Sequence, residues 1–91
     1  MNSTDKAREI AEILEGVVAG VLDGGRALDR GPDLETESDR LLTSAWHHLQ
    51  HFVDDADIRR RDLEYAQSQR DVLLRYAREI RSAYGIGTFA S

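Results

Sequence analysis

The fold is decided by the stretch LLTSAWHHLQHFVDDADIRRRDLEYA, residues 41–66, in which two helical patterns meet. Before residues 54–57 the apolar side chains recur every three or four positions, which is typical of one face of an amphipathic helix. The same spacing resumes beyond this acidic segment and continues to Tyr84. The second half of the chain is therefore expected to form two amphipathic helices or one continuous helix.

The two apolar faces do not line up with each other. At about 100° per residue, the face centred on Leu49 and the face centred on Leu73 differ by about a third of a turn. A straight helix through both would bury the wrong side, and the aspartates within residues 54–57 can cap a new helix. These features predict a long helical hairpin, with helices over residues 34–54 and 57–84.

One long helix is the alternative. The heptad positions from Leu42 to Tyr84 are apolar except at Arg59 and Arg70, and a supercoil absorbs the phase drift. Such a helix of about 50 residues would extend roughly 75 Å and would need a partner chain to cover its apolar seam. Residues 54–57 include neither glycine nor proline. The alternative of a short helix plus one long helix that dimerises therefore stays open.

Residues 4–22 carry a third helical pattern. Its apolar positions follow the same spacing: Ala7, Ile10, Ala11, Leu14, Val17, Val18 and Val21. Ser3 or Thr4 can cap its start, and Gly24 with Gly25 is expected to end it. The sequence therefore predicts a first helix over residues 4–22.

Two further segments complete the chain. Residues 23–33 contain three glycines and the only proline, which predicts a linker. Gly85 predicts the end of the last helix, followed by a short tail, residues 85–91, in which Ile86 and Phe89 can fold back on the helix end or reach a neighbour. The expected fold is all-α: a small three-helix antiparallel bundle with a long helical hairpin, in a single domain.

The charge is acidic and unevenly spread over the 91 residues. Residues 1–57 hold 13 acids and 5 bases, a net −8, whereas residues 58–91 hold 4 acids and 7 bases, a net +3. Overall acidity argues against nucleic acid as a partner, because phosphate contacts need a clustered positive surface. The acidic part of one chain could pair with the basic part of a second, antiparallel copy. Equally, the two parts could belong to helices that pack together within one chain. Because so short a chain builds a limited core, we expect a homodimer or a complex with another helical protein.

The sequence also indicates the compartment. The longest uncharged run, residues 41–53, has 13 residues, fewer than the roughly 20 that cross a bilayer, and the polar start does not resemble a signal peptide. Without cysteine, disulfides and thiolate metal sites are excluded. A cytoplasmic location without membrane contact is the default expectation. Eleven of the twelve basic residues are arginine, which suggests a GC-rich, bacterial genome.

Three histidines form the most unusual local cluster. His47 and His51 are one helical turn apart, a spacing at which two imidazoles can share a metal ion, and Asp55 can add an oxygen ligand. His48 and Trp46 are candidates for contact with a small ligand. The competing interpretation is a solvated polar face that happens to use histidine, with His48 at the edge of the core.

A second candidate surface is an interface with another chain. Gly16 and Gly20, followed by Gly24, form a small-x-x-x-small track that permits close helix approach. Together with the apolar seam they give these candidate interface residues: Gly16, Gly20, Leu49, Phe52, Leu73 and Ile80. A close crossing within the bundle would explain the same glycines.

No pattern of an enzyme is present in the sequence. There is no glycine-rich phosphate loop, no nucleophile elbow, and no sign that the paired carboxylates are buried and tuned. We therefore expect a protein without catalytic residues or cofactor, acting as a helical protein-interaction module, a small adaptor or regulator. A bundle that binds a metal or small ligand through the histidines, and an accessory subunit of an enzyme complex, are the alternatives.

Overall fold

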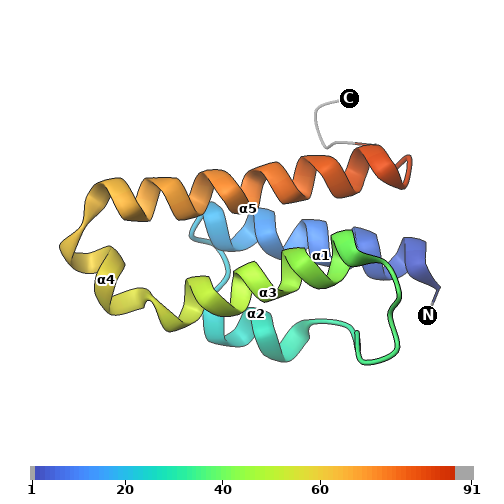
Figure 1. Cartoon of the computed structure of the whole chain (residues 1–91), viewed down its shortest axis with the longest axis horizontal. Helices are drawn as coiled ribbons and strands as arrows, with labels where there is room; N and C mark the ends of the chain where they lie inside the picture. Colours follow the sequence, from blue (N-terminus) through green and yellow to red (C-terminus); the bar gives the residue numbers. More distant parts are fainter. Residues whose placement is uncertain (1, 88–91) are drawn as a thin grey trace.

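Five α-helices occupy residues 2–87, the part of the chain that the computed structural model describes. They are α1 (Ser3–Val18), α2 (Gly24–Arg30), α3 (Arg40–Asp54), α4 (Ala56–Arg61) and α5 (Leu63–Ala83). The helices α1, α3 and α5 form the bundle, α2 lies against α3, and α4 makes the corner between α3 and α5 (Figure 1). The predicted all-α bundle is confirmed.

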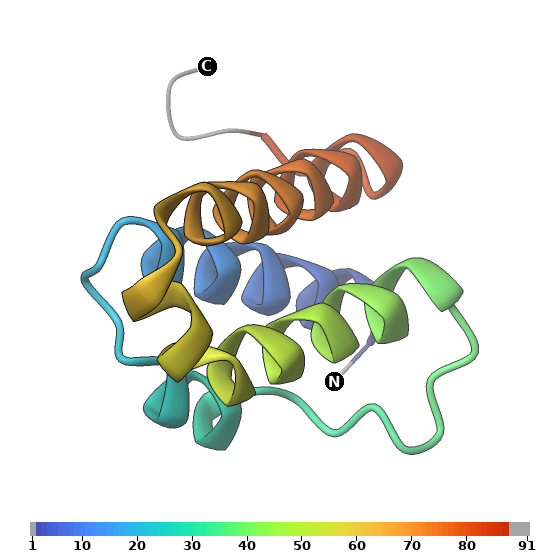
Figure 2. The ribbon, with the colours of Figure 1, turned by 60° about the vertical axis from the view of Figure 1, so that its left-hand side comes forward.

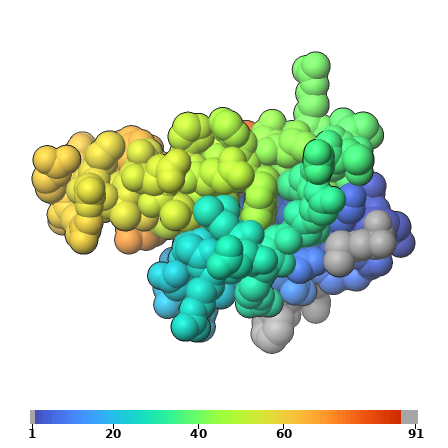
Figure 3. Space-filling view, turned by 90° about the horizontal axis from the view of Figure 1, so that it is seen from below, coloured from blue at the N-terminus to red at the C-terminus, as the bar shows by residue number. Residues whose placement is uncertain are grey.

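The directions of the helices follow from the path of the chain between α1 and α3. The helix α2 and the segment 31–39 carry the chain back along the bundle, so α1 and α3 run in the same direction and α5 runs against both (Figure 2). Seen from below, α2 and this segment lie across one face of the molecule (Figure 3).

The first helix ends earlier than the sequence predicted. Gly20 has a φ of +77°, in the left-handed region that glycine adopts without strain. The amides of Gly20 and Val21 donate to the carbonyls of Val17 and Gly16 at 3.1 and 3.0 Å, which is the Schellman arrangement of a helix end. The prediction of residues 4–22 is therefore corrected to Ser3–Val18.

The linker predicted at residues 23–33 is wrong for most of its length, because it contains α2. The carboxylate of Asp23 accepts a hydrogen bond from the Arg26 amide at 3.2 Å and caps this helix. Ala27 is fully buried, and a Cβ on Gly24 would lie 2.9 Å from Cγ2 of Val53 on α3. Glycine here permits close packing of α2 on α3 and does not stop a helix.

The helix predicted from residue 34 begins only at Arg40. The Asp33 carboxylate accepts from the Glu35 amide at 2.9 Å and stabilises a turn instead of a helix. Asp39 is the residue that caps α3, accepting from the Leu41 amide at 2.8 Å.

The predicted hairpin is present, and the alternative of one long helix is wrong. Asp55, within the predicted break, separates α3 from α4. A second break follows at Asp62, whose extended backbone and carboxylate, which accepts from the Tyr65 amide at 3.0 Å, start α5. The helix predicted over residues 57–84 is therefore divided in two, and α5 folds back beside α3 (Figure 1).

The last helix ends where the sequence predicted. Gly85 has a φ of +65°, and the Ile86 amide donates to the Arg81 carbonyl at 2.8 Å. Ile86 packs against the core, which is the first of the two alternatives for the tail. Phe89 lies outside the described residues.

One core joins the three long helices, with α1 packed against both α3 and α5. Its largest fully buried side chains are Ile10, Ile13 and Leu14 of α1, Leu42 and Leu49 of α3, and Leu73 and Ile80 of α5. The first helix therefore covers the apolar seam of the hairpin, which removes the seam's need for a second chain.

Candidate functional site

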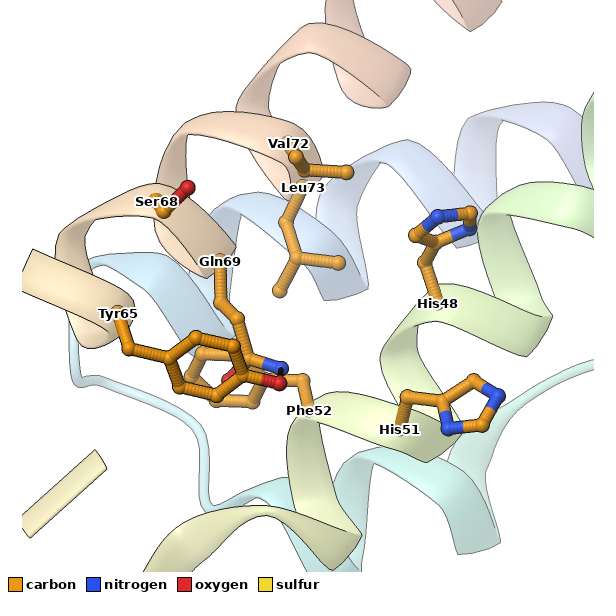
Figure 4. Close-up of a pocket in the computed structure, with 8 residues that line it drawn as sticks. All are labelled: His48, His51, Phe52, Tyr65, Ser68, Gln69, Val72 and Leu73. Atoms are coloured by element: carbon orange, nitrogen blue, oxygen red, sulfur yellow. Dashed lines mark hydrogen bonds between the residues drawn. The ribbon is translucent and has the colours of Figure 1, made fainter. Parts of the chain in front are cut away.

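A hollow opens between α3 and α5, on the side of the hairpin away from α1 (Figure 4). Its volume is about 200 Å³, and its lining residues are His48, His51, Phe52, Tyr65, Ser68, Gln69, Val72 and Leu73. Phe52 and Leu73 are 8% and 1% exposed and form an apolar floor. The remaining side chains place imidazole, hydroxyl, phenol and amide groups around this floor.

The polar end of the hollow is built on Asp55. Its Oδ2 accepts hydrogen bonds from the Tyr65 hydroxyl at 2.7 Å and from Nε2 of Gln69 at 3.0 Å. The hydrogen bond to the Asp55 carboxylate raises the pKa of Tyr65, because it favours the neutral phenol. These contacts fasten the end of α3 to the first turns of α5.

Arg59 of α4 lies on the same corner. Its guanidinium lies 3.6 Å from the centroid of the Phe52 ring, donates to the Phe52 carbonyl, and donates to Oε1 of Gln69 at 3.0 Å. Burial lowers the pKa of Arg59, an effect that the Asp55 charge opposes. The corner is thus a cross-linked polar unit that holds Phe52 and Gln69 at the edge of the hollow.

Two further hollows adjoin the first. One of about 350 Å³ is lined by His48, Val72, Arg75, Tyr76 and Glu79, and another of about 300 Å³ by Thr43, Ser44, His47 and His48. His48 lines all three, with Nδ1 3.0 Å from the Ser44 carbonyl oxygen. We call this continuous surface between Tyr65 and Glu79 of α5 and Thr43 and Phe52 of α3 the α3–α5 groove.

The lining residues of α5 recur at helical spacing along the groove. Ser68, Val72, Arg75 and Glu79 are separated by three or four residues, which places them on one face of the helix. The groove is therefore elongated, following α5 for about 16 Å at the rise of a helix.

The metal ligands predicted from the sequence are only partly brought together. Nε2 of His47 and Nε2 of His51 lie 3.0 Å apart, with the two exposed rings edge to face. Asp55 does not join them, because its carboxylate is bonded to Tyr65 and Gln69 of α5. Within residues 2–87, no group of three or more histidine, aspartate or glutamate side chains is arranged to hold a metal ion.

His48 and Trp46, which were predicted to contact a small ligand, lie in different parts of the structure. His48 lines the groove, whereas the Trp46 ring packs on Gly31, where an added Cβ would lie 2.0 Å from Cη2 of the indole. Trp46 is therefore a packing residue between α3 and the segment that follows α2.

Four of the six candidate interface residues lie in the core of the chain. Leu49, Phe52, Leu73 and Ile80 are between 0% and 8% exposed, and all four belong to the core. A Cβ on Gly16 would lie 3.3 Å from Cβ of Leu22, and Gly20 forms the end of α1. Gly16 therefore leaves room for Leu22 of the same chain, whereas within residues 2–87 no atom beyond its chain neighbours lies within 4 Å of a Cβ built on Gly20.

Seven groove residues of α5 were not predicted from the sequence: Tyr65, Ser68, Gln69, Val72, Arg75, Tyr76 and Glu79. Val72 could have been identified from the sequence, because it is an apolar residue beside the buried stripe that contains Leu73 and Ile80. Tyr65 and Gln69 can donate hydrogen bonds to Asp55 because α4 turns the chain between α3 and α5. The sequence did not predict α4 as a separate helix.

No family model, curated protein or solved structure matches this chain. None of the described helices combines the length and apolar character that crossing a bilayer requires.

Proposed function

We propose that the protein is a non-enzymatic helical interaction module that receives an amphipathic helix of a partner protein in the α3–α5 groove. The observation that carries this proposal is the row of three hollows that meet at His48. Recognition of this kind depends on apolar side chains spaced by three, four and seven residues along the incoming helix. Two of the hollows lie between α3 and α5 and the third lies on α3 alone, so they offer several separate positions for the side chains of an incoming helix.

The shape of the groove favours a helix over a small molecule. A site for a small molecule encloses most of the ligand in one cavity. Here the space is divided among three hollows of about 200, 300 and 350 Å³. The groove gains its extent from length, which an elongated partner can use.

The exposed apolar residues argue for a partner other than a second copy of the chain. In the described part, the large hydrophobic residues that are exposed are Val21, Ile58 and Leu63. Val21 follows α1, Ile58 is on the short α4, and Leu63 begins α5, so they do not form one apolar helix face. Within residues 2–87, a second copy has no such face to insert without opening its own core.

The compartment and setting are part of the proposal. The sequence has no cysteine and is acidic, which is compatible with a bacterial cytoplasm, and its negative charge opposes binding to nucleic acid. We propose a protein partner there, for which the module serves as an adaptor, a regulator or an accessory subunit of a larger complex.

A displayed library of amphipathic helical peptides tests the proposal. Peptides enriched on the wild-type protein are titrated against two variants at adjacent positions, Ser68→Arg and Gln67→Arg. Both positions are exposed, but only Ser68 lines the groove; Gln67 bonds Asp71 on the outer face of α5. We expect Ser68→Arg to weaken binding about tenfold or more, equivalent to 1.4 kcal/mol, and Gln67→Arg to leave it unchanged. No enrichment, or equal binding by both variants, would contradict the groove as the binding surface.

A further inference from the structure

We propose that His47 and His51 form one half of a transition-metal site, which the same two histidines of a second copy complete. The proposal rests on the placement of their rings on α3. The two Nε2 atoms lie 3.0 Å apart, the ring centroids are separated by 4.6 Å, and the ring planes are inclined at 79°. His47 and His51 also line parts of the α3–α5 groove, so a second copy held there by a metal ion would compete with an incoming helix.

The separation of the two nitrogens matches that of neighbouring ligands on one metal ion. With metal–nitrogen bonds of 2.0–2.1 Å, two imidazole nitrogens are about 3.3 Å apart at a tetrahedral angle and about 2.9 Å apart at a right angle. The observed 3.0 Å lies between these values. The separation therefore suits two ligands of one ion, once the two rings turn from their mutual hydrogen bond so that both lone pairs meet at that ion.

The proton between the rings is the group that the metal replaces. Without metal, the hydrogen bond requires one Nε2 to carry a proton and the other to accept it. Zinc, nickel and copper bind neutral imidazole through an unprotonated nitrogen. Binding therefore requires that both His47 and His51 carry their proton on Nδ1, with the Nε2 proton exchanged through solvent.

One chain does not complete the site. A closed zinc site has four protein ligands, whereas no third histidine, aspartate or glutamate joins His47 and His51 within the described residues. Both side chains are exposed on α3, so the pair of a second copy can approach. Two copies related by a two-fold axis supply four nitrogens. A divalent cation between them also offsets part of the repulsion between two chains that each carry −5.

The test measures mass and metal content together. Light scattering after gel filtration is performed on the full chain with chelator and with added Zn²⁺, and bound zinc is quantified in each peak. We expect a monomer with chelator and a zinc-dependent dimer holding one ion per two chains. His51→Ala and His47→Ala should each raise the zinc concentration needed for dimerisation by about tenfold or more.

His48→Ala is the matched control, because it removes the neighbouring imidazole and leaves the pair intact. It should dimerise with zinc as the wild type does. Circular dichroism verifies that each variant is folded, which we expect because all three side chains are exposed. A wild-type protein that stays monomeric with zinc, a one-to-one complex with zinc, or dimerisation that persists unchanged in His51→Ala would each overturn the proposal.

Discussion

The imidazole of His48 and the phenol ring of Tyr76 face each other across the α3–α5 groove, with ring centroids 4.9 Å apart and planes inclined at 43°. His48 lines all three hollows and Tyr76 lines one of them. The pair therefore lies where the hollows join, and its position determines how an incoming helix can follow the groove.

Replacing His48 with alanine should weaken a groove-bound helix without destabilising the fold. Its side chain is exposed, so we expect the free energy of unfolding to change by less than about 0.5 kcal/mol. Loss of its ring contacts should lower peptide affinity by about tenfold. Gln50→Ala is the control, because Gln50 is an exposed residue of α3 that lines none of the three hollows. Peptide titration and urea unfolding of both variants check this prediction; equal affinities would refute it.

Gly31→Ala should destabilise the chain because the added Cβ would overlap the Trp46 indole, at 2.0 Å from Cη2 and 2.1 Å from Cζ2. We expect a loss of about 1–3 kcal/mol in the free energy of unfolding by urea. The loss should shrink in a Trp46→Leu background, where the ring is absent. Gly25→Ala, whose Cβ meets only Oδ2 of Asp23 at 3.3 Å, should change stability by less than about 0.5 kcal/mol. A cost at residue 31 that is independent of Trp46 would contradict this explanation.

The two partners of the ion pair between α1 and α5 should differ in how much stability is lost when each is replaced. Arg81 is 9% exposed; it donates to both Glu15 oxygens at 2.9 and 2.7 Å and to the Gly87 carbonyl at 2.7 Å. The Glu15 side chain is 39% exposed. Glu15→Ala leaves a nearly buried cation without its partner and should cost about 2–4 kcal/mol.

Arg81→Met keeps the aliphatic packing and leaves only a hydrated carboxylate, so its cost should be smaller, about 1 kcal/mol. Arg8→Ala removes an exposed pair with Asp5 and should cost less than about 0.5 kcal/mol. Urea unfolding of the three variants measures the loss in free energy of unfolding for each. A loss for Arg81→Met that equals or exceeds the loss for Glu15→Ala would contradict this prediction.

Tyr84 makes stability depend on alkaline pH. Burial, together with the hydrogen bond that its hydroxyl donates to Asp39, raises the pKa of Tyr84 to about 12, compared with about 10 in an unfolded chain. The neutral phenol therefore stabilises the fold fully below pH 10, and this contribution is lost as the pH rises towards 12. Tyr84→Phe should lack that part of the decline. Tyrosinate absorbance should show a step near pH 12 in the wild type that the variant lacks; a Tyr84 step near pH 10 would contradict the prediction.

Apolar spacing predicted the helical segments and favoured the hairpin over one long helix. The phase difference between the Leu49 and Leu73 faces located the turn at Asp55, because a helix exposes or buries each face as a unit. Gly85 was recognised as a helix end because it directly follows the last periodic residue.

Contacts between residues distant in the chain explain the incorrect boundaries. Gly20 and Gly24 look alike in the sequence, yet one ends α1 in the left-handed region and the other packs within α2 against Val53. Asp33 and Asp39 are both able to cap a helix, and tertiary contacts decide between them: Asp39 also accepts from Tyr84 of α5. Such choices depend on partners distant in the chain, which periodicity does not reveal.

The candidate site was predicted least well. The spacing of His47 and His51 correctly placed their nitrogens together, because residues four apart share a helix face. The groove needs α5 beside α3, and its polar end needs Asp55 turned towards Tyr65 and Gln69. These positions are set by α4, whose second break at Asp62 was not predicted.

The most direct test of the α3–α5 groove is a map of backbone amide shifts when ¹⁵N-labelled protein binds a selected helical peptide. We predict one-to-one binding, with the largest shifts at Ser68, Val72 and Tyr76 of α5 and at His48 of α3. The contrasting surface is the hollow between α1 and α2 that includes Ile13, Leu22 and Arg30. Largest shifts there, with the groove residues unchanged, would contradict the proposed function.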